Sequence, residues 1–489
     1  MTTREELQHR CANSYLSNDD LLPAKQNWNW YNIFAFWMSD VHSAGGYVFA
    51  GTLFSLGLTG WQVFVSLIVG ILIVQVLANT IGRASQKYAV PFPVISRMVF
   101  GVIGSNLASL TRGIIAIVWY GIQTYLASTA LLVTVLYFYP SLDAINHDNL
   151  AGLSTLGWYC FITMWLFQTA LFLMKMNVIK KFIDWAGPAV YVVMLVLMFY
   201  IIYKAGWSNI SFSLHDKELT PGESFWNIIV GISLIVSYFA GPTLNYGDFA
   251  QFCKTEQHMR KGNFWGLPIN FVFFSSIAVI TISGTPAVFG KMLIDPIHVM
   301  GYLDTPLVVL LMGVTLLVAT IGVNIVANFV SAAFDISNVF PKHITWRRGG
   351  LIAAVASVVI LPWNLFNSPE TIHYTIDVLA GLLGPLYGVI IIEYYVVRKE
   401  KIDLVSLYDP TPQGQYWYTK GVNIPAVLCV LLGGAISAGA FLSPEGWGGF
   451  EFLLFHRDDC LDPSLPTRQG QSDYRNTLSA TKLTELRMG

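Results

Sequence analysis

The sequence predicts an all-α membrane protein with about 11 transmembrane helices, ten of which form a five-plus-five inverted repeat. Three observations carry this prediction. Hydrophobic residues make up 54% of the 489 residues and charged residues only 12%, against about 25% charged in a typical soluble domain. Long apolar runs recur along the chain, and most exceed the ~20 residues needed to cross a bilayer core. The first and sixth runs are both interrupted by residues that disfavour a helix.

The two interruptions lie at matching positions in the predicted repeat. The first run carries the letters DVHSAGG at 40–46, and the sixth carries FAGP at 239–242. Unpaired backbone N–H and C=O groups cost several kcal/mol each in lipid, so broken helices survive there only under cover of protein or a polar cavity. Breaks in the first and sixth spans therefore indicate a carrier that binds a small solute between its two halves.

The apolar runs and their loops divide the chain into five parts. We expect a cytoplasmic N-terminal segment at 1–29, a first five-helix repeat at 30–205 and a second at 206–397. A cytoplasmic loop with an eleventh helix follows at 398–442, and 443–489 is a polar, disordered tail. The predicted spans are 30–57, 61–82, 106–138, 156–174, 183–205, 224–246, 263–289, 304–338, 349–367, 372–397 and 421–442.

The charged residues of the loops predict the orientation in the membrane. Lysine and arginine gather on one side, where Arg97 and Arg112 are counted, and only Lys204, Lys217 and Lys291 fall on the other. Because cytoplasmic loops carry the excess of positive charge, we expect a cytoplasmic N-terminus in a bacterial-type inner (plasma) membrane. The proline-broken segment 88–97 then lies on the cytoplasmic side, either along the interface or packed under the bundle.

Composition argues against several other partners. The five cysteines show neither a disulfide framework nor the spacing of a metal site. The net charge of −1 gives no indication of a nucleic-acid partner. We expect no cofactor, no nucleic acid and a monomer embedded in the lipid bilayer.

The third predicted span contains a pair of residues suited to a planar ligand. Trp119 and Gln123 are four residues apart and share one helix face. A tryptophan offers a flat apolar wall and a glutamine offers an amide edge, which together suit a planar amide or imide. The alternative is a hydrogen bond between helices beside a tryptophan that only packs.

The eighth predicted span carries a polar stripe at spacings of three and four residues. Such a stripe is expensive against lipid, so it must face the interior. It either binds a ligand, with an amide edge at Asn328, or joins helices by polar contacts. Its members are Thr320, Asn324, Asn328, Ser331 and Asp335.

Ionisable groups lie near the middle of the first span. Asp40 and His42 are functional candidates because charged groups are rare at that depth. A histidine titrates near neutral pH and can carry a coupling proton. The alternative is structural, with Asp40 supporting the break and His42 bonded to a carbonyl. Glu393 and Arg398, near the cytoplasmic end of the tenth span, are expected to form a structural ion pair.

Several ordered motifs over about residues 20–442 resemble the nucleobase–cation–symport type 1 family, which includes bacterial hydantoin, allantoin, cytosine and uracil permeases. The resemblance implies the leucine-transporter fold and cation-coupled import by alternating access. The motifs are KYAVPFPVISR at 87–97, WYGIQ at 119–123, NYGDF at 245–249, ATIGVNIVAN at 319–328 and LGPLYG at 383–388, followed by Arg398 and LY at 407–408.

The resemblance also implies a set of substrate-binding residues. It assigns a ligand sandwich to Trp119 and Phe239, and polar contacts to Gln123, Asn328, the backbone near Gly241, and Ser43. Phe239 stands where many members have a second tryptophan, and Ser43 stands where hydantoin and allantoin transporters carry an amide. Both departures favour a compact ring such as uracil, with an allantoin, hydantoin or purine permease as the alternative.

The sodium site of the family, where it exists, maps onto Ser39 and His42 of the first helix and Ala319, Gly322 and Val323 of the eighth. Gly322 and Val323 bring no side-chain oxygen, and a hard cation needs oxygen ligands. We therefore expect a coupled proton rather than sodium and assign no metal site.

The remaining sequence features concern a twelfth helix and the alternatives to a transporter. Residues 443–489 neither span nor resemble the twelfth helix of the family, which we therefore expect to be missing, whether naturally or as an artefact. A channel would need a continuous polar pore, whereas the stripes converge near the midplane. An enzyme would need a motif such as HExxH or GxSxG, and the sequence has none. A substrate-sensing receptor on the same fold stays open.

Overall fold

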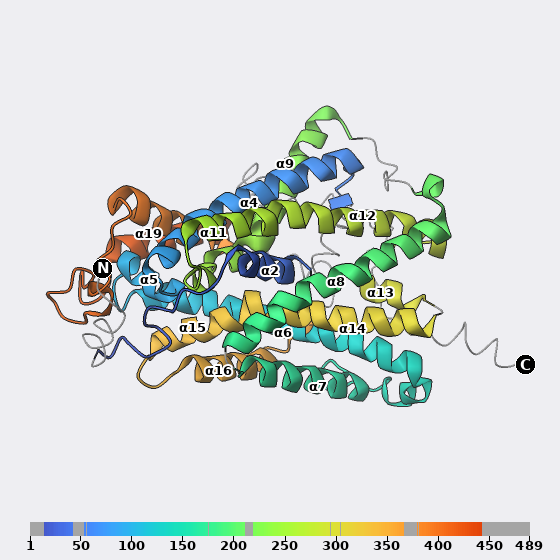
Figure 1. Cartoon of the computed structure of the whole chain (residues 1–489), viewed down its shortest axis with the longest axis horizontal. Helices are drawn as coiled ribbons and strands as arrows, with labels where there is room; N and C mark the ends of the chain where they lie inside the picture. The colour runs from blue at the N-terminus through green and yellow to red at the C-terminus, as the bar shows by residue number, and fades with distance from the viewer. Residues whose placement is uncertain are drawn as a thin grey trace, which may run out of the picture.

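The computed structural model describes residues 14–42, 53–54, 56–174, 176–210, 219–293, 295–303, 305–365, 379 and 381–442. Within these ranges the chain is helical, and β pairing is limited to isolated bridges. The long helices lie side by side along the long axis of an elongated bundle (Figure 1). The predicted all-α class is confirmed.

The helices of the first half follow the predicted order. They are α2 (Trp30–Val41), α4 (Gly60–Tyr88), α5 (Phe92–Phe100), α6 (Ser105–Phe138), the 3₁₀ turn η1 (Pro140–Ile145), α7 (Thr155–Phe172), α8 (Met176–Ala205) and the 3₁₀ turn η2 (Trp207–Asn209).

The second half contains three π-helical segments, η3, η4 and η6, inside its long helices. Its elements are α9 (Pro221–Leu244), α10 (Gly247–Ala250), α11 (Glu256–Phe264), η3 (Trp265–Ile269), α12 (Asn270–Phe289), α13 (Pro296–Gly301), α14 (Pro306–Val323), η4 (Asn324–Phe329), α15 (Val330–Val339), α16 (Trp346–Val359), η5 (Pro362–Leu365), α18 (Gly384–Ile391), η6 (Ile392–Val397), η7 (Ser406–Tyr408) and α19 (Ile424–Leu442).

Six helices in the described part of the chain are long and apolar enough to cross a membrane by length and composition. Two shorter apolar helices cover Gly384–Val397 and Ile424–Ser437. The count of about 11 spans, the domain boundaries and the cytoplasmic N-terminus stay predictions. The expected tail at 443–489 lies outside the described residues.

Side-chain caps mark where several helices begin. Thr59 and Gln62 form a capping box at the start of α4, and Thr220 and Glu223 form another at the start of α9. Each box pairs two backbone N–H groups that the first helical turn leaves without partners. Pro221 follows Thr220 at the first helical position, where its missing N–H costs nothing.

The two halves interlock around the third and eighth helices. α6 packs against α14 and α15, and also against α7 and α16. On the other side of the bundle α4 packs against α9 and α11. The short α2 lies between these two groups and contacts α8, α11 and η3 (Figure 1). Helices of one half thus pack on their counterparts in the other.

The two predicted breaks have different outcomes. α2 ends at Val41, and His42 leaves the helical region with φ −84° and ψ 72°, so this break begins within the predicted segment. The next residues, including Ser43, lie outside the described residues. α9 instead runs through Phe239 and Pro242 and ends at Leu244. The predicted break at 239–242 is therefore wrong by a few residues.

The helix survives past Phe239 because its last carbonyls find side-chain partners. Arg112 donates from Nε to the oxygen of Gly241 at 3.1 Å, and the Tyr387 hydroxyl donates to the oxygen of Ala240 at 2.6 Å. Pro242 lies in the last turn, where it removes one backbone donor, and the helix continues for only two residues beyond it. The chain turns only at Asn245, before the single-turn α10.

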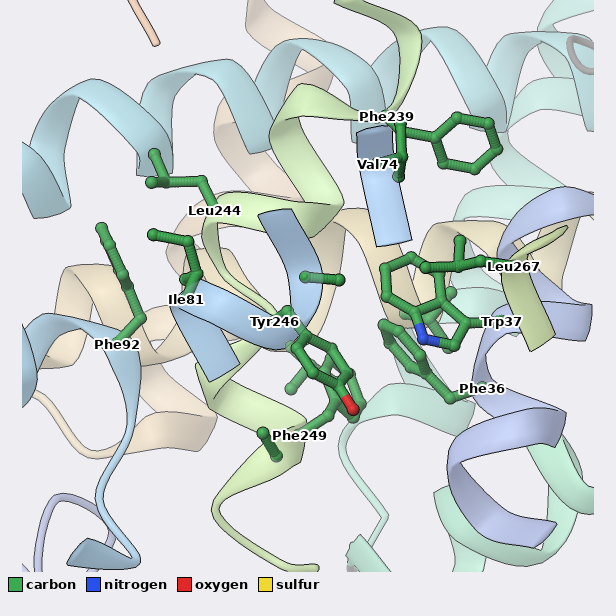
Figure 2. Close-up of a cluster of buried hydrophobic side chains, with 14 of the residues drawn as sticks. Phe36, Trp37, Val74, Ile81, Phe92, Phe239, Leu244, Tyr246, Phe249 and Leu267 are labelled. Atoms are coloured by element: carbon green, nitrogen blue, oxygen red, sulfur yellow. The ribbon is translucent and has the colours of Figure 1, made fainter. Parts of the chain in front are cut away.

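An aromatic cluster joins α2 to the turn after α9 (Figure 2). The rings of Trp37 and Tyr246 stack with centroids 5.2 Å apart, and those of Phe36 and Phe249 lie 4.4 Å apart. Trp37 Nε1 donates to Asn263 Oδ1 at 2.7 Å. Buried indole and phenol rings need such partners for their polar atoms. The cluster therefore holds the end of the first helix against the sixth and seventh.

The proline-broken segment at 88–97 packs under the bundle, which decides between the two predicted positions. All nine residues of α5 are buried. Arg97 is 0% exposed and donates to Asn338 Oδ1 and to the carbonyl oxygens of Leu16 and Leu407. Arg97 is thus a buried structural residue rather than a loop charge. The expected ion pair between Glu393 and Arg398 is present at 2.8 Å.

We predict that Gly262→Ala lowers the apparent Tm of the purified protein. A Cβ at Gly262 would stand 2.7 Å from the carbonyl oxygen of Trp30 and press on Ile33, so α11 and α2 must move apart. Such overpacking costs about 1–3 kcal/mol, against a gain of about 1 kcal/mol in helix propensity.

Gly388→Ala is the matched control, because a Cβ there meets nothing within 4 Å. It should leave the apparent Tm unchanged or raise it. Equal Tm values for the two variants would contradict the close packing of α11 on α2.

Candidate functional site

A buried cavity lies where α2, α6, the end of α9 and η4 meet. The empty space between its walls, including the part open to solvent, is about 560 Å³. The lining residues are Asp40, Arg112, Ile115, Trp119, Gln123, Ser237, Tyr238, Gly241, Pro242, Val323, Ala327, Asn328, Leu379 and Leu383.

Four of the six residues predicted to bind substrate line this one cavity. Trp119 and Gln123 come from α6, Gly241 from the end of α9 and Asn328 from η4. Gln123 and Asn328 are each 3% exposed. The Gln123 Oε1 atom is buried without a partner among the described residues. Buried polar atoms normally have partners, so this cavity offers a ligand an amide edge.

The structure does not bring Phe239 to the cavity. Its ring is 1% exposed and packs edge-on against Phe271, with centroids 5.4 Å apart, within the buried cluster of Figure 2. Its neighbour Tyr238 lines the cavity instead. Successive residues of a helix point about 100° apart, so the continuation of α9 through this region exchanges the two aromatic positions.

The polar stripe of the eighth span faces the interior as predicted. Its five members, Thr320, Asn324, Asn328, Ser331 and Asp335, are all buried. The interpretation as polar contacts between helices holds at Asn324, and ligand binding at Asn328 stays a prediction. Asn324 joins helices by donating to Gln168 of α7 at 2.7 Å, whereas Asn328 lines the cavity.

Arg112, like Arg97, is buried, although the sequence pattern predicts a loop charge at both positions. It lies in α6, is 1% exposed, and lines the cavity. Besides its bond to Gly241, its Nη2 donates to the oxygen of Ala327 in η4 at 2.6 Å. Arg112 thus ties the last turn of α9 to η4 beside the cavity. Its spacing of seven residues before Trp119 indicates the shared helix face and could have revealed this position.

An acidic cluster neighbours this guanidinium. The charges of Asp335, Asp248 and Asp40 all act on Arg112. Asn245 donates from its Nδ2 to Oδ2 of Asp248 and to Oδ2 of Asp335, both at 3.0 Å. Three buried carboxyl groups therefore neighbour one arginine beside the cavity.

The predicted cation-site residues are only partly together. Ser39 lies against Gly322, where a Cβ would stand 3.7 Å from the Ser39 Oγ, and Ala319 and Val323 are buried on the same helix. His42 points elsewhere, with Nδ1 3.2 Å from the oxygen of Gly187 and Nε2 3.1 Å from Oδ1 of Asn270. Among the described residues no group of three or more His, Cys, Asp or Glu side chains is arranged to hold a metal ion.

Comparison with known proteins gives consistent relatives. Residues 22–455 match the family model described as permease for cytosine/purines, uracil, thiamine, allantoin. The allantoin permease of Bacillus subtilis (strain 168) is 35% identical over 86% of this chain and 86% of that protein. The purine-uracil permease NCS1 of Arabidopsis thaliana is 31% identical over 86% of this chain and 70% of that protein.

Solved structures share the fold. Mhp1, a nucleobase-cation-symport-1 family transporter solved in a closed conformation with bromovinylhydantoin bound, superposes with a TM-score of 0.68 at 22% identity, covering 91% of this chain and 98% of that one. MhsT in complex with L-phenylalanine gives a TM-score of 0.55 at 14% identity, covering 85% and 99%. The predicted leucine-transporter fold is therefore confirmed.

We predict that Arg112→Met lowers the stability of the protein by about 1–3 kcal/mol for each buried carbonyl, at Gly241 and Ala327, that loses its guanidinium donor. The substitution also removes the positive charge that opposes the nearby carboxyl charges. The apparent Tm of the purified protein should fall accordingly. Combining it with Asp335→Asn should restore part of the loss, because the double variant removes one of those charges.

Arg398→Met is the control. Its pair with Glu393 is partly exposed, so its loss should cost about 1 kcal/mol or less. Additive effects in the double variant would argue against electrostatic coupling between Arg112 and Asp335.

Proposed function

The chain belongs to the family of permeases for cytosine/purines, uracil, thiamine and allantoin, and from that premise we propose that it imports a small planar cyclic amide or imide by cation-coupled alternating access. The observation that carries the proposal is the convergence of Trp119, Gln123 and Asn328 on one buried cavity. Members of this family are permeases, so membership also supports the expectation that the chain is not an enzyme.

The cavity chemistry supports a flat heterocycle as substrate. Trp119 and Tyr238 contribute aromatic walls, on which a ring can stack by its face. Gln123 and Asn328 contribute amides that can hydrogen-bond to the edge of the ring. A site built to bond N–H and C=O groups rejects apolar rings of the same shape, because its own polar groups would be left unpaired.

Uracil and allantoin are the two candidate substrates, and different observations favour them. The short Ser43 at the first-helix position favours the compact uracil. Phe239 does not line the cavity, so the size of its ring gives no support to uracil. The identity of 35% with a bacterial allantoin permease favours allantoin. Both rings carry N–H groups next to carbonyls, so the same amide edges can serve either.

We predict that at least one of uracil and allantoin competes for uptake, and that Tyr238→Ala weakens this competition more than Phe239→Leu. Loss of a stacking aromatic costs about 1–3 kcal/mol per base, or about 5- to 150-fold. Phe239 lies outside the cavity, so its substitution should change affinity by less than about threefold.

The measurement is competition by uracil, allantoin, hydantoin, xanthine and cytosine in proteoliposomes containing the purified protein. Exchange of labelled for unlabelled solute separates a carrier from a substrate-sensing receptor, which binds without exchange. A larger effect of Phe239→Leu than of Tyr238→Ala would contradict the assignment of the aromatic wall.

We also propose that the coupling ion is a proton. A sodium site between the first and eighth helices would lack two side-chain oxygens, because Gly322 and Val323 supply none. The Ser39 hydroxyl is buried there without a partner among the described residues, but one hydroxyl is a poor substitute for the missing ligands.

The hydrogen bonds of His42 support it as the proton carrier. The oxygen of Gly187, opposite Nδ1, can only accept. Asn270 donates its Nδ2 to the carbonyl of Gly266 at 3.0 Å, so its Oδ1, opposite Nε2, is also an acceptor. A neutral imidazole has one donor and one acceptor, whereas an imidazolium has two donors. Only protonated His42 can donate to both partners.

The other groups around His42 do not change the fact that both of its ring nitrogens face acceptors. From α8 the Tyr191 ring lies 4.1 Å away and its hydroxyl donates to Asn270 Oδ1 at 2.6 Å. From α12 the neighbours are Asn270 and the ring of Phe274. On its own helix, Asp40 lies two residues away. Loss of the proton would leave one ring nitrogen without a hydrogen and facing an acceptor, which favours rearrangement at the end of α2.

We predict that His42→Gln abolishes proton-driven accumulation while solute exchange continues, because glutamine can bond but cannot carry the proton. The assay imposes a pH gradient across proteoliposomes and measures labelled uptake, then repeats it with a sodium gradient. His147→Gln is the control, because His147 is exposed and pairs only with Asp143. Uptake that follows sodium and ignores the pH gradient would sink the proposal.

A further inference from the structure

Three side-chain amides form a chain that leads from the cavity to the fourth helix. Asn328 of η4 donates from Nδ2 to Oδ1 of Asn324 at 2.9 Å. Asn324 donates from its own Nδ2 to Oε1 of Gln168 in α7 at 2.7 Å, and to the backbone oxygen of Tyr120 in α6 at 3.2 Å. Asn324 and Gln168 are 0% exposed.

The backbone oxygen of Tyr120 fixes the direction of this chain. A carbonyl oxygen can only accept, so the end of Asn324 that faces it must be the NH₂ group. The other end of Asn324 is then an oxygen, and the Asn328 atom that bonds to it must be NH₂. Asn328 is therefore left with its carbonyl oxygen as the free end of its amide, and its side chain lines the cavity.

We propose that Asn324 is a positioning residue that holds the Asn328 oxygen available to the cavity, so that the site favours rings that present an N–H donor, rather than a lone pair, at the edge facing this oxygen. The inference rests on the proposed function, because it concerns which ring the transporter accepts. A ring nitrogen that carries a lone pair in place of the N–H would face the Asn328 oxygen acceptor to acceptor. Turning the Asn328 amide over would break its bond to Asn324.

Gln123 does not impose the same choice. Its Oε1 has no partner among the described residues, and no backbone carbonyl there fixes the direction of its amide. Gln123 can rotate to present either its oxygen or its NH₂ group to a ligand. The fixed amide of Asn328 therefore distinguishes a ring N–H donor from a ring lone pair, while the Gln123 amide can rotate to suit either.

Uracil and cytosine are suitable probes because they have the same shape and opposite senses along one edge. Uracil offers an N–H donor at N3 beside a carbonyl acceptor at C4. Cytosine offers a lone-pair acceptor at N3 beside an amino donor at C4. A fixed Asn328 oxygen favours the first edge, and an amide that is free to turn over tolerates both.

The test measures competition by cytosine and by whichever of uracil, allantoin and hydantoin binds most tightly, in wild type and in Asn324→Leu. In wild type the imide or ureide should compete at least about tenfold better than cytosine, as expected for a mismatched buried hydrogen bond. In Asn324→Leu the ratio should fall to within about threefold of one, because the Asn328 amide is released.

Thr320→Val is the matched control. Thr320 lies one turn before Asn324, is buried, and donates only to the oxygen of Leu316 within its own helix. It should keep the wild-type ratio. A purely structural role for Asn324 would weaken all competitors together and leave the ratio unchanged. If Asn324→Leu does not fold, Asn324→Ala serves as the second variant.

The outcomes separate this inference from the proposed function. Binding of none of these rings to wild type would overturn the proposed function itself. Binding with equal affinity for cytosine and the imide in wild type would overturn only the inference, and so would a folded Asn324 variant that keeps the full wild-type ratio.

Discussion

The buried guanidinium of Arg112 is the contact on which the rest of the site depends. It comes from the third helix and binds the carbonyl oxygens of Gly241 at the end of α9 and Ala327 in η4. Buried charges need hydrogen bonds; the two carbonyls serve Nε and Nη2, while Nη1 is buried without a partner among the described residues. Arg112 thereby connects a helix of the first half to two helices of the second.

The hydrogen bonds of Arg112 have a property that apolar packing lacks. A hydrogen-bonded guanidinium can exchange a carbonyl for water at modest cost, whereas separating an apolar contact exposes surface to water. Alternating access requires the two halves to part and meet again beside the same cavity. The polar contacts of Arg112 next to the cavity suit that requirement. The aromatic cluster around Trp37 and Tyr246 holds the neighbouring helices together.

The sequence predicts the fold and part of the site, and the failures have identifiable causes. Trp119, Gln123 and Asn328 could be assigned because helical spacing alone sets which residues share a face. Phe239 could not, because its direction depends on whether the chain is helical or broken there, and that is decided by Tyr387 and Arg112 from distant segments. Arg112 was misassigned because a hydropathy pattern treats a positive residue near a span's end as a loop charge.

The π-helical segments could not be predicted from the sequence either, and an amide that fixes a hydrogen-bonding direction lies at one end of η3 and another at the start of η4. At the end of η3 the backbone N–H of Asn270 donates to the carbonyl oxygen of Trp265, five residues earlier. The carbonyl oxygen of Gly266 is then available to accept from the Asn270 side chain. That amide in turn faces His42.

In the eighth helix the amide of Asn324, at the start of η4, is held by the backbone oxygen of Tyr120 and in turn orients Asn328. In both places the functional group takes its direction from an amide pinned to a backbone carbonyl. A carbonyl cannot reverse its role as acceptor. The proposed choices of a proton at His42 and of an N–H donor at Asn328 therefore follow from the path of the backbone.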